Sequence, residues 1–324
     1  MTSDPMARAA AALGDATSVA IACHVNPDAD ALGSMLGLSN HLRGMGKETV
    51  CSFGNDPFAA PRWAAELPGL DVLVPPDRFP RDPVVMVTCD CASMERLGSL
   101  AGAAVRSKTL IWIDHHVTNE GLGRVAIIDP AASSTSELVW RLVRTFGGEI
   151  SIETAKCLYA GLVTDTGRFQ YEAVRPETLR LAAELREYPF DHTRLVQALY
   201  EDSGVADLRL LAVALSRIRL EEDVNLVWTY LTRGDLGVAG VDGGTTEDLI
   251  DVVRTAREAD VTAVIKQQRD GRFKVSLRSR GEHDVAAVAA RFGGGGHRLA
   301  SGFTSSKGLA ETVDGLRAAL GSAP

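Results

Sequence analysis

The stretch SVAIACHVNPDAD, residues 18–30, decides the fold of this chain. It begins with the apolar run SVAIAC, which is typical of a strand buried on both faces of a parallel sheet. A helical pattern over Asp30–Leu42 follows, and the alternation of strand and helix favours a parallel α/β architecture. His24, Asp28 and Asp30 lie where the strand gives way to the helix. Side chains that can bind cations therefore follow the first strand directly.

Further apolar runs predict additional strands of the same sheet. We expect them over Thr49–Phe53, Asp71–Val74, Val84–Cys89, Thr109–Ile113 and Val125–Ile128. Apolar residues at helical spacing then predict a series of helices. These cover Ser134–Phe146, Ile152–Thr164, Glu177–Glu187 and His192–Leu199. The first part of the chain is therefore expected to form a parallel-sheet α/β domain.

The C-terminal part repeats this alternation on a smaller scale. Strands are predicted over Leu226–Leu231, Val261–Gln267 and Arg272–Arg278, and helices over Thr246–Ala256, Asp284–Arg291 and Leu309–Leu320. Asp270-Gly271, between the last two strands, is a strong hairpin signal. We therefore expect an α/β fold with a parallel-sheet domain over 1–188, a helical linker over 189–219 and a smaller α/β domain over 220–324.

The composition limits the partners of this chain. It has 324 residues, of which 45% are hydrophobic and 23% charged, a mix typical of a soluble globular enzyme. Its 34 Lys and Arg residues against 42 Asp and Glu residues give a net charge of -8. Such a surface repels long nucleic acids, because their binding depends on neutralising phosphates. A phosphate ligand therefore needs a local site that overcomes the overall negative field.

Neither a membrane segment nor a secretory signal is expected. No apolar stretch approaches the ~18 residues that span a bilayer, and Asp4 and Asp15 interrupt the Ala-rich start of the chain. The five cysteines are odd in number and show no CxxC spacing. This pattern favours buried, reduced thiols over a disulfide or a zinc site. We therefore expect a cytoplasmic protein without a membrane partner.

Candidate ligand residues also follow two of the later strands. Asp90 follows the strand VVMVTC, and Asp114, His115 and His116 follow the strand TLIWI. Asp165 ends a predicted apolar helix, where its charge opposes the helix dipole. In open parallel sheets, ligands bind at the edge formed by the carboxyl ends of the strands. The sequence thus predicts that these side chains gather at one edge of the sheet.

Taken one at a time, these residues have ordinary structural explanations. Asp30 and Asp90 could each cap a helix, and the two histidines could be a satisfied polar strand end. Taken together they point to cations, because converging carboxylates repel one another unless positive charge neutralises them. Two divalent ions carry about the charge that four carboxylates need, and imidazoles add nitrogen ligands. The pattern therefore predicts a two-metal site.

These motifs, in this order, resemble those of the DHH phosphoesterases. The set runs from His24-x-Asn-Pro-Asp28-x-Asp30 through Asp90 and Asp114-His115-His116 to Asp165. The segment Gly293-Gly294-Gly295-Gly296-His297, followed by Ala300-Ser301-Gly302, resembles the family's DHH-associated C-terminal domain. The length and the lack of insertions look most like the branch of nano-RNases and pAp phosphatases. That branch is similar in chemistry to phosphodiesterases of cyclic di-AMP and pApA.

The resemblance implies a role for each matching position. One Mn²⁺ would be held by His24, Asp28 and Asp90, and a second by Asp30, Asp90, His115 and Asp165, so that Asp90 bridges the two. His116 would face the substrate phosphate, which makes His116 and Asp90 the catalytic residues. For Asp114 we favour the ordinary structural interpretation, a residue that orients a histidine. Each subunit would hold two Mn²⁺ ions, with Mg²⁺ or Co²⁺ as substitutes.

The C-terminal domain is expected to hold the substrate. Consecutive glycines let backbone N–H groups approach a phosphate, and arginine binds phosphate through paired hydrogen bonds. The candidate substrate-binding residues are Gly294, Gly295, Gly296, His297, Arg298, Arg278 and Ser279. Ser134, before a predicted helix, either caps that helix or contacts the substrate phosphate. The resemblance places the active site in a cleft between the two domains.

The implied activity is that of a metal-dependent phosphodiesterase or exonuclease. Its substrates would be oligoribonucleotides of a few residues, pApA and cyclic di-AMP, hydrolysed to nucleoside monophosphates by hydroxide that two metal ions activate. Conversion of pAp to AMP is a further implied reaction. A pyrophosphatase or polyphosphatase of the same superfamily, a catalytically inactive nucleotide-binding regulator and a DNA exonuclease remain alternatives. The resemblance also implies a homodimer.

Overall fold

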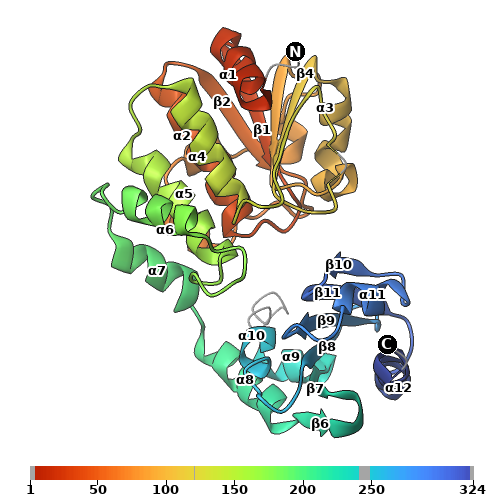
Figure 1. The fold of residues 1–324 in the computed structure, drawn as a ribbon. Helices are drawn as coiled ribbons and strands as arrows, with labels where there is room; N and C mark the ends of the chain where they lie inside the picture. The colour runs from red at the N-terminus through yellow and green to blue at the C-terminus, as the bar shows by residue number, and fades with distance from the viewer. Residues whose placement is uncertain (1–3, 120, 241–248, 322–324) are drawn as a thin grey trace. The chain divides into compact units, whose positions relative to one another are not determined.

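The computed structural model describes residues 4–119, 121–240 and 249–321. The chain divides into two compact units, one ending at Asp202 and one beginning at Ser203 (Figure 1). The division falls within residues 189–219, the segment predicted as a linker. Each unit has a sheet and a hydrophobic core of its own.

The first unit is built on a five-stranded sheet in the order β2-β1-β3-β4-β5. The strands are β1 (Ser18–Cys23), β2 (Glu48–Phe53), β3 (Val85–Cys89), β4 (Thr109–Asp114) and β5 (Val125–Ile128). All of the pairings between them are parallel, which confirms the predicted architecture. The strand β3 lies at the centre of the sheet.

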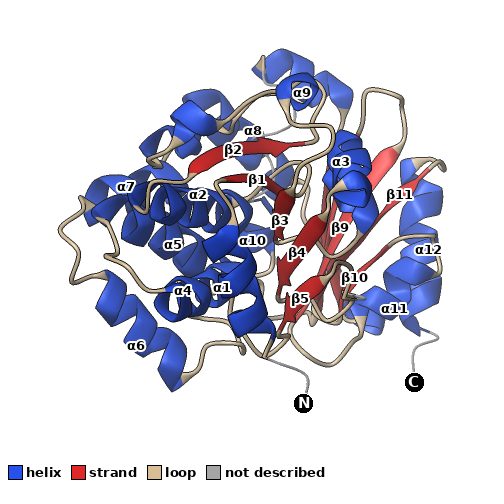
Figure 2. Cartoon of the chain, turned by 90° about the horizontal axis from the view of Figure 1, so that it is seen from above, coloured by secondary structure: helices blue, strands red, loops and turns tan. Residues whose placement is uncertain are grey.

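Helices cover both faces of this sheet (Figure 2). On one face lie α1 (Pro5–Asp15), α2 (Ala29–Gly44), α4 (Thr135–Phe146) and α5 (Ile152–Asp165), and on the other lies α3 (Ala101–Arg106). Val19 and Ile21 of β1 pack into the first core, and Ala20 and Ala22 into the second. Because both faces are buried, the strands are apolar without alternation. The helices α6 (Pro176–Leu185) and α7 (His192–Tyr200) pack against the first core.

The prediction of a strand over Asp71–Val74 is wrong. Leu70–Val72 form a short 3₁₀ helix, and Leu73 makes an isolated bridge to Cys51. Pro75 and Pro76 follow and lack the N–H groups that would extend a strand pairing. Further 3₁₀ helices cover Arg62–Glu66, Pro76–Arg78, Met94–Leu100 and Glu222–Val224.

Glycines allow α2 to pack closely against α5. A Cβ added at Gly33 of α2 would lie 2.5 Å from the carbonyl oxygen of Cys157 in α5. A Cβ added at Gly161 of α5 would lie 2.5 Å from Oδ1 of Asp30. These small residues therefore bring the helix that carries Asp30 against the helix that ends at Asp165.

We expect Gly33→Ala to destabilise the first unit, because the added methyl group meets the backbone of α5. Overpacking of this kind typically costs ~1–3 kcal/mol. Gly44→Ala at the end of the same helix is the matched control, since nothing lies within 4 Å of its added Cβ. Urea denaturation measures the free energy of unfolding of both variants. Equal stability of the two would contradict the close packing of α2 on α5.

The second unit contains a six-stranded mixed sheet in the order β10-β11-β9-β8-β7-β6. The strands are β6 (Arg219–Glu221), β7 (Leu226–Leu231), β8 (Val261–Gln267), β9 (Phe273–Ser279), β10 (Gly295–His297) and β11 (Ala300–Ser305). The pair β7 and β8 is parallel, and the other neighbours are antiparallel. The predicted hairpin between β8 and β9 is confirmed, with Gly271 at a φ of +86°.

Helices cover both faces of the second sheet as well. The helices α11 (Val285–Ala290) and α12 (Leu309–Gly321) pack on one face, and α8 (Val205–Ser216), α9 (Arg233–Ala239) and α10 (Leu249–Val253) on the other. The helix predicted over Thr246–Ala256 begins in residues outside the described ranges. Across the described residues, we find no helix with the length and apolar character that a membrane span requires.

Part of the Gly-rich segment forms a strand. Gly295, Gly296 and His297 form β10, which pairs with β11. A Cβ added at Gly296 would lie 2.6 Å from the carbonyl oxygen of Ala300, so the pairing depends on the missing side chain. Glycine has a low strand propensity, and for that reason the pattern alone does not indicate the strand.

Candidate metal centre

The ends of three neighbouring strands meet at one edge of the first sheet. Cys89 of β3 pairs with Cys23 of β1 and with Ile113 of β4. The residue that follows each of these therefore lies level with its neighbours at the carboxyl edge. These residues are His24, Asp90 and Asp114. The sheet register thus brings the sequence motifs together.

Two residues of these strand ends have left-handed backbone conformations, Asn26 at a φ of +53° and Asp90 at +59°. Short polar side chains tolerate this region better than most residues. The N–H of Asn26 donates to Oδ1 of Asn55 at 2.7 Å, and Nδ2 of Asn55 donates to Oδ1 of Asn26 at 2.7 Å. Asn55, which follows β2, thereby fixes the loop that carries the first motif. No motif of the sequence indicates this role of Asn55.

His24, Asp28 and Asp90 form the first group of candidate ligands. Nε2 of His24 lies 3.6 Å from Oδ2 of Asp28 and 3.4 Å from Oδ2 of Asp90. Asp28 also caps α2, since its Oδ1 accepts hydrogen bonds from the N–H groups of Asp30 and Ala31. The two oxygens of Asp28 thus serve different partners, one the helix and the other the ligand group.

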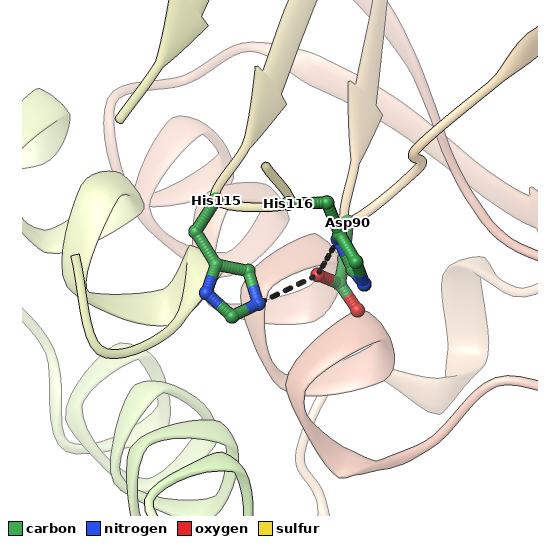
Figure 3. Close-up of side chains that lie close together, drawn as sticks. All are labelled: Asp90, His115 and His116. Carbon is green, nitrogen blue, oxygen red and sulfur yellow. Dashed lines mark ion pairs between the residues drawn. The ribbon is translucent and has the colours of Figure 1, made fainter. Parts of the chain in front are cut away.

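Asp30, His115 and Asp165 form the second group. Nε2 of His115 lies 3.2 Å from Oδ2 of Asp165 and 3.7 Å from Oδ1 of Asp90 (Figure 3). Asp90 therefore presents one oxygen to each group, Oδ2 toward His24 and Oδ1 toward His115. A carboxylate placed in this way is suited to contact two cations at once.

His116 belongs to a third, overlapping group with Asp90 and His115. Both histidines point toward Asp90 (Figure 3). Nδ1 of His116 lies 2.7 Å from Oδ1 of Asp114, which is fully buried. Nδ2 of Asn119 donates to the other oxygen of Asp114 at 2.6 Å. Asp114 therefore orients His116, as expected, and Asn119 is a supporting residue that the motif pattern does not include.

The N-terminus of α4 stabilises two of the carboxylates. The N–H groups of Thr135 and Ser136 donate to the two oxygens of Asp30 at 2.6 and 2.9 Å. The hydroxyl of Thr135 donates to Oδ1 of Asp90 at 2.8 Å. Because helix N-termini attract negative charge, α4 offsets part of the repulsion between these buried groups. The sequence marks the start of this helix, but the role of Thr135 was missed.

The pKa values follow from burial and crowding. Burial and the charge of Asp90 raise the pKa of Asp30 to about 7, and burial with neighbouring carboxylates raises the pKa of Asp165. Burial lowers the pKa of His24, but hydrogen bonds to Asp28 and Asp90 outweigh it and raise that pKa to about 10. In the absence of cations, bound protons therefore balance the carboxylates, and cation binding must displace those protons.

The donor set fits divalent metal ions. Within each group, the candidate ligand atoms all lie within 4.8 Å of one another. Carboxylate oxygens together with imidazole nitrogens suit Mn²⁺ and related first-row ions. Hydrogen bonds from Thr135 and Asn119 hold the carboxylates of Asp90 and Asp114 in place, as outer partners do in metal sites.

Ser134 and the candidates of the second unit occupy different surroundings. Ser134 is buried and caps α4, and its hydroxyl accepts a hydrogen bond from the N–H of Glu137 at 3.1 Å.

In the second unit, His297 of β10 pairs with Ala300 of β11, and Ala300 pairs with Arg278 of β9. Directly paired residues share a face of a sheet. His297 and Arg278 therefore lie in one row on the same face.

The remaining candidates flank this row. Gly295 and Gly296 belong to β10, and Arg298 follows that strand directly. Ser279 ends β9 and is buried. Gly294 precedes β10, where an added Cβ would collide with the carbonyl oxygen of Gly302. The expected cleft between the domains stays a prediction.

We expect Thr135→Val to weaken the binding of Mn²⁺ by about 10-fold, because outer hydrogen-bond partners of metal ligands contribute about that much. Valine keeps the shape of threonine and the backbone N–H that Asp30 accepts, while Asp90 loses its hydroxyl donor. Thr145→Val, on an exposed part of the same helix, is the matched control. Titration calorimetry measures the affinity. Equal affinities for the two variants would contradict the role assigned to this hydroxyl.

The chain is similar to known proteins along most of its length. A bifunctional oligoribonuclease and PAP phosphatase NrnA of Thermus thermophilus is 34% identical over 298 residues, which cover 89% of this chain and 84% of the relative. The cyclic-di-AMP phosphodiesterase GdpP of Geobacillus thermodenitrificans is 28% identical over 88% of this chain, and the match covers 44% of that relative.

Solved structures and family models agree with the sequence matches. The crystal structure of an exopolyphosphatase-related protein from Bacteroides fragilis has a TM-score of 0.91 at 29% identity, covering 98% of this chain and 95% of that one. The model of the DHH family N-terminal domain matches residues 18–162, and the model of the DHHA1 domain matches residues 223–323. The motifs, the fold and the similarity therefore lead to one conclusion: the chain belongs to the DHH family and carries a DHHA1 domain after its DHH domain.

Proposed function

We propose that this chain is a metal-dependent phosphodiesterase and exonuclease that acts on very short nucleotides. Its substrates are oligoribonucleotides of a few residues, pApA and cyclic di-AMP, which it hydrolyses to nucleoside monophosphates, and pAp, which it converts to AMP. The observation that carries the proposal is Asp90, whose two oxygens face two different groups of cation ligands. The activities by which the NrnA and GdpP relatives are named support the substrate class.

We assign two Mn²⁺ ions per subunit to this site, with Mg²⁺ or Co²⁺ as substitutes. The residues that would hold them are His24, Asp28 and Asp90 for one ion, and Asp30, Asp90, His115 and Asp165 for the other. Divalent cations in such a site act as Lewis acids toward a phosphoryl group and lower the pKa of water. The protein orients the ligands and buries the carboxylates of Asp30 and Asp90.

His116 is assigned to the substrate phosphate. The hydrogen bond between its Nδ1 and Asp114 fixes the orientation of the ring. Burial lowers the pKa of His116, but the hydrogen bond to Asp114 outweighs it, so the pKa is raised. A protonated imidazole offsets phosphoryl charge and can donate a proton to the departing oxygen. His116 thus complements the cations with a proton donor.

The second unit is assigned to hold the substrate. Arg278 and His297 lie in one row of its sheet, and Arg298 follows β10, so donors for a phosphate gather around the neighbouring strands β9, β11 and β10. The net charge of -8 disfavours long strands, since their affinity depends on many phosphate contacts. Short substrates need few such contacts, which agrees with a local binding site.

The homodimer, the cytoplasmic location and the placement of the active site in a cleft between the domains are further parts of this proposal. The homodimer and the cleft come from the family resemblance, and the location from the cysteine pattern. Light scattering coupled to size-exclusion chromatography tests the dimer, because the mass of the chain is 34.5 kDa. A monomeric but active enzyme would remove the dimer from the proposal and leave the assigned chemistry standing.

A substrate panel with added Mn²⁺ tests the proposed activity. We expect faster release of nucleoside monophosphates from pApA, cyclic di-AMP and short RNA than from long RNA, because the acidic chain repels long strands. Inorganic pyrophosphate serves as the competing substrate. Release of phosphate from pyrophosphate faster than AMP from pApA would favour the pyrophosphatase alternative. Tight nucleotide binding without turnover would favour an inactive regulator.

We expect Asp90→Ala to abolish turnover and to remove both cations, because this carboxylate faces both ligand groups. Metal analysis of the purified variant and its rate on pApA are the measurements. Asp71→Ala is the control, since Asp71 pairs with Arg43 at the surface. An Asp90→Ala protein that retains two cations and activity would show that the assignment of the bridging residue is wrong.

The affinity for Mn²⁺ is expected to rise with pH. At neutral pH His24, with a pKa of about 10, is protonated, and Asp30, with a pKa of about 7, is protonated in about half of the molecules. A cation must displace those protons, and fewer remain to be displaced as the pH rises from about 6 to about 8. Titration calorimetry in buffers of different ionisation enthalpy measures both affinity and proton release. Affinity that is independent of pH, with no protons released, would contradict the assigned ligands.

A further inference from the structure

A buried carboxylate organises one loop of the second unit. Asp260, just before β8, is 6% exposed. Its Oδ1 accepts hydrogen bonds from the backbone N–H groups of Arg280 and Glu282 at 3.0 and 3.1 Å. Its Oδ2 contacts the N–H and the Nδ1 of His283 at 2.9 and 2.8 Å and accepts from the hydroxyl of Ser279 at 3.0 Å. Asp260 therefore holds the whole connection between β9 and α11.

This connection in turn holds the segment between β10 and β11. The N–H of Ser279 donates to the carbonyl of Leu299 at 3.0 Å, and the N–H of Val285 donates to the carbonyl of Arg298 at 2.9 Å. The guanidinium of Arg298 donates to the carbonyl of Gly281 at 2.9 Å. The loop and the segment are thus joined at three points, and a shift of one displaces the other.

Asp260, Glu282 and His283 have ligand atoms within 4.8 Å of one another, but they are better explained as a hydrogen-bonded group than as a cation site. Five polar groups of the chain contact the two oxygens of Asp260, whereas Asp30 accepts from two backbone N–H groups. Glu282 is exposed. Burial raises the pKa of Asp260, but the hydrogen bonds from His283 and from the backbone outweigh it and hold that pKa below its usual value. The carboxylate is satisfied by the protein itself.

We propose that Asp260 is a positioning residue for substrate binding in the DHHA1 domain. By fixing the loop after β9, it sets the position of Arg298 and of the end of β9 that carries Arg278. This inference rests on the proposed function, which assigns Arg278, His297 and Arg298 to the substrate phosphate. The metal centre lies in the other unit, so loosening this loop leaves the cation ligands unchanged.

The test is Asp260→Asn, which keeps the size of the side chain and one acceptor oxygen. Its amide NH₂ replaces an oxygen that three donor groups contact. We expect the KM for pApA to rise by about 10-fold and kcat to change by less than about twofold, the signature of lost substrate binding. The affinity for Mn²⁺ is expected to stay at the wild-type value. If this variant fails to fold, His283→Ala removes a single side-chain contact and is expected to raise KM by a smaller factor.

Asp235→Asn is the matched control in the same unit. Asp235 pairs with Arg217 and accepts from the hydroxyl of Thr232 at the start of α9, so its loss loosens the unit at a different place. An unchanged KM in Asp260→Asn, or an equal rise of KM in both variants, would overturn the inference. Failure of the wild-type enzyme on every nucleotide of the panel would instead count against the proposed function. The two failures are therefore distinguishable.

Discussion

Repulsion among buried carboxylates is the constraint on which the first unit depends. Asp30, Asp90 and Asp114 are 1%, 3% and 0% exposed, and unpaired buried charges are costly. Hydrogen-bond donors at fixed positions stabilise these carboxylates. The first N–H groups of α4 donate to Asp30, and the hydroxyl of Thr135 donates to Asp90. Asp114 contacts His116 and Asn119. The charge that remains is balanced by protons or by cations.

Both units contain a buried carboxylate that backbone N–H groups hold in place, but the two carboxylates have different roles. In each, a buried carboxylate is held by backbone N–H groups of one short segment, Asp30 by the start of α4 and Asp260 by the loop after β9. Asp30 accepts from two backbone N–H groups and belongs to a group of cation ligands with His115 and Asp165, whereas five polar groups of the chain contact the oxygens of Asp260. The first arrangement leaves a charge to be neutralised, and the second yields a rigid loop.

The main features of the site could be predicted from the sequence because the motif residues directly follow strands. Parallel strand ends must meet at one edge, so the gathering of His24, Asp90 and His115 follows from local patterns. The supporting contacts could not be predicted in this way. Thr135 reaches Asp90 across 45 positions of sequence, and Asn55 reaches Asn26 across 29. Such contacts depend on how helices and loops pack, which periodicity does not encode.

The left-handed backbone of Asp90, at a φ of +59°, restricts how this position can change during evolution. Glutamate would keep the carboxylate, but its longer side chain is less tolerant of that conformation and adds a methylene to a buried group. Asparagine and glycine suit the backbone, and each is reached from an aspartate codon by one base change. A descendant lineage that abandons hydrolysis is therefore expected to carry asparagine or glycine here. The backbone conformation at position 90 would thus still limit the choice of residue in relatives that have lost the activity.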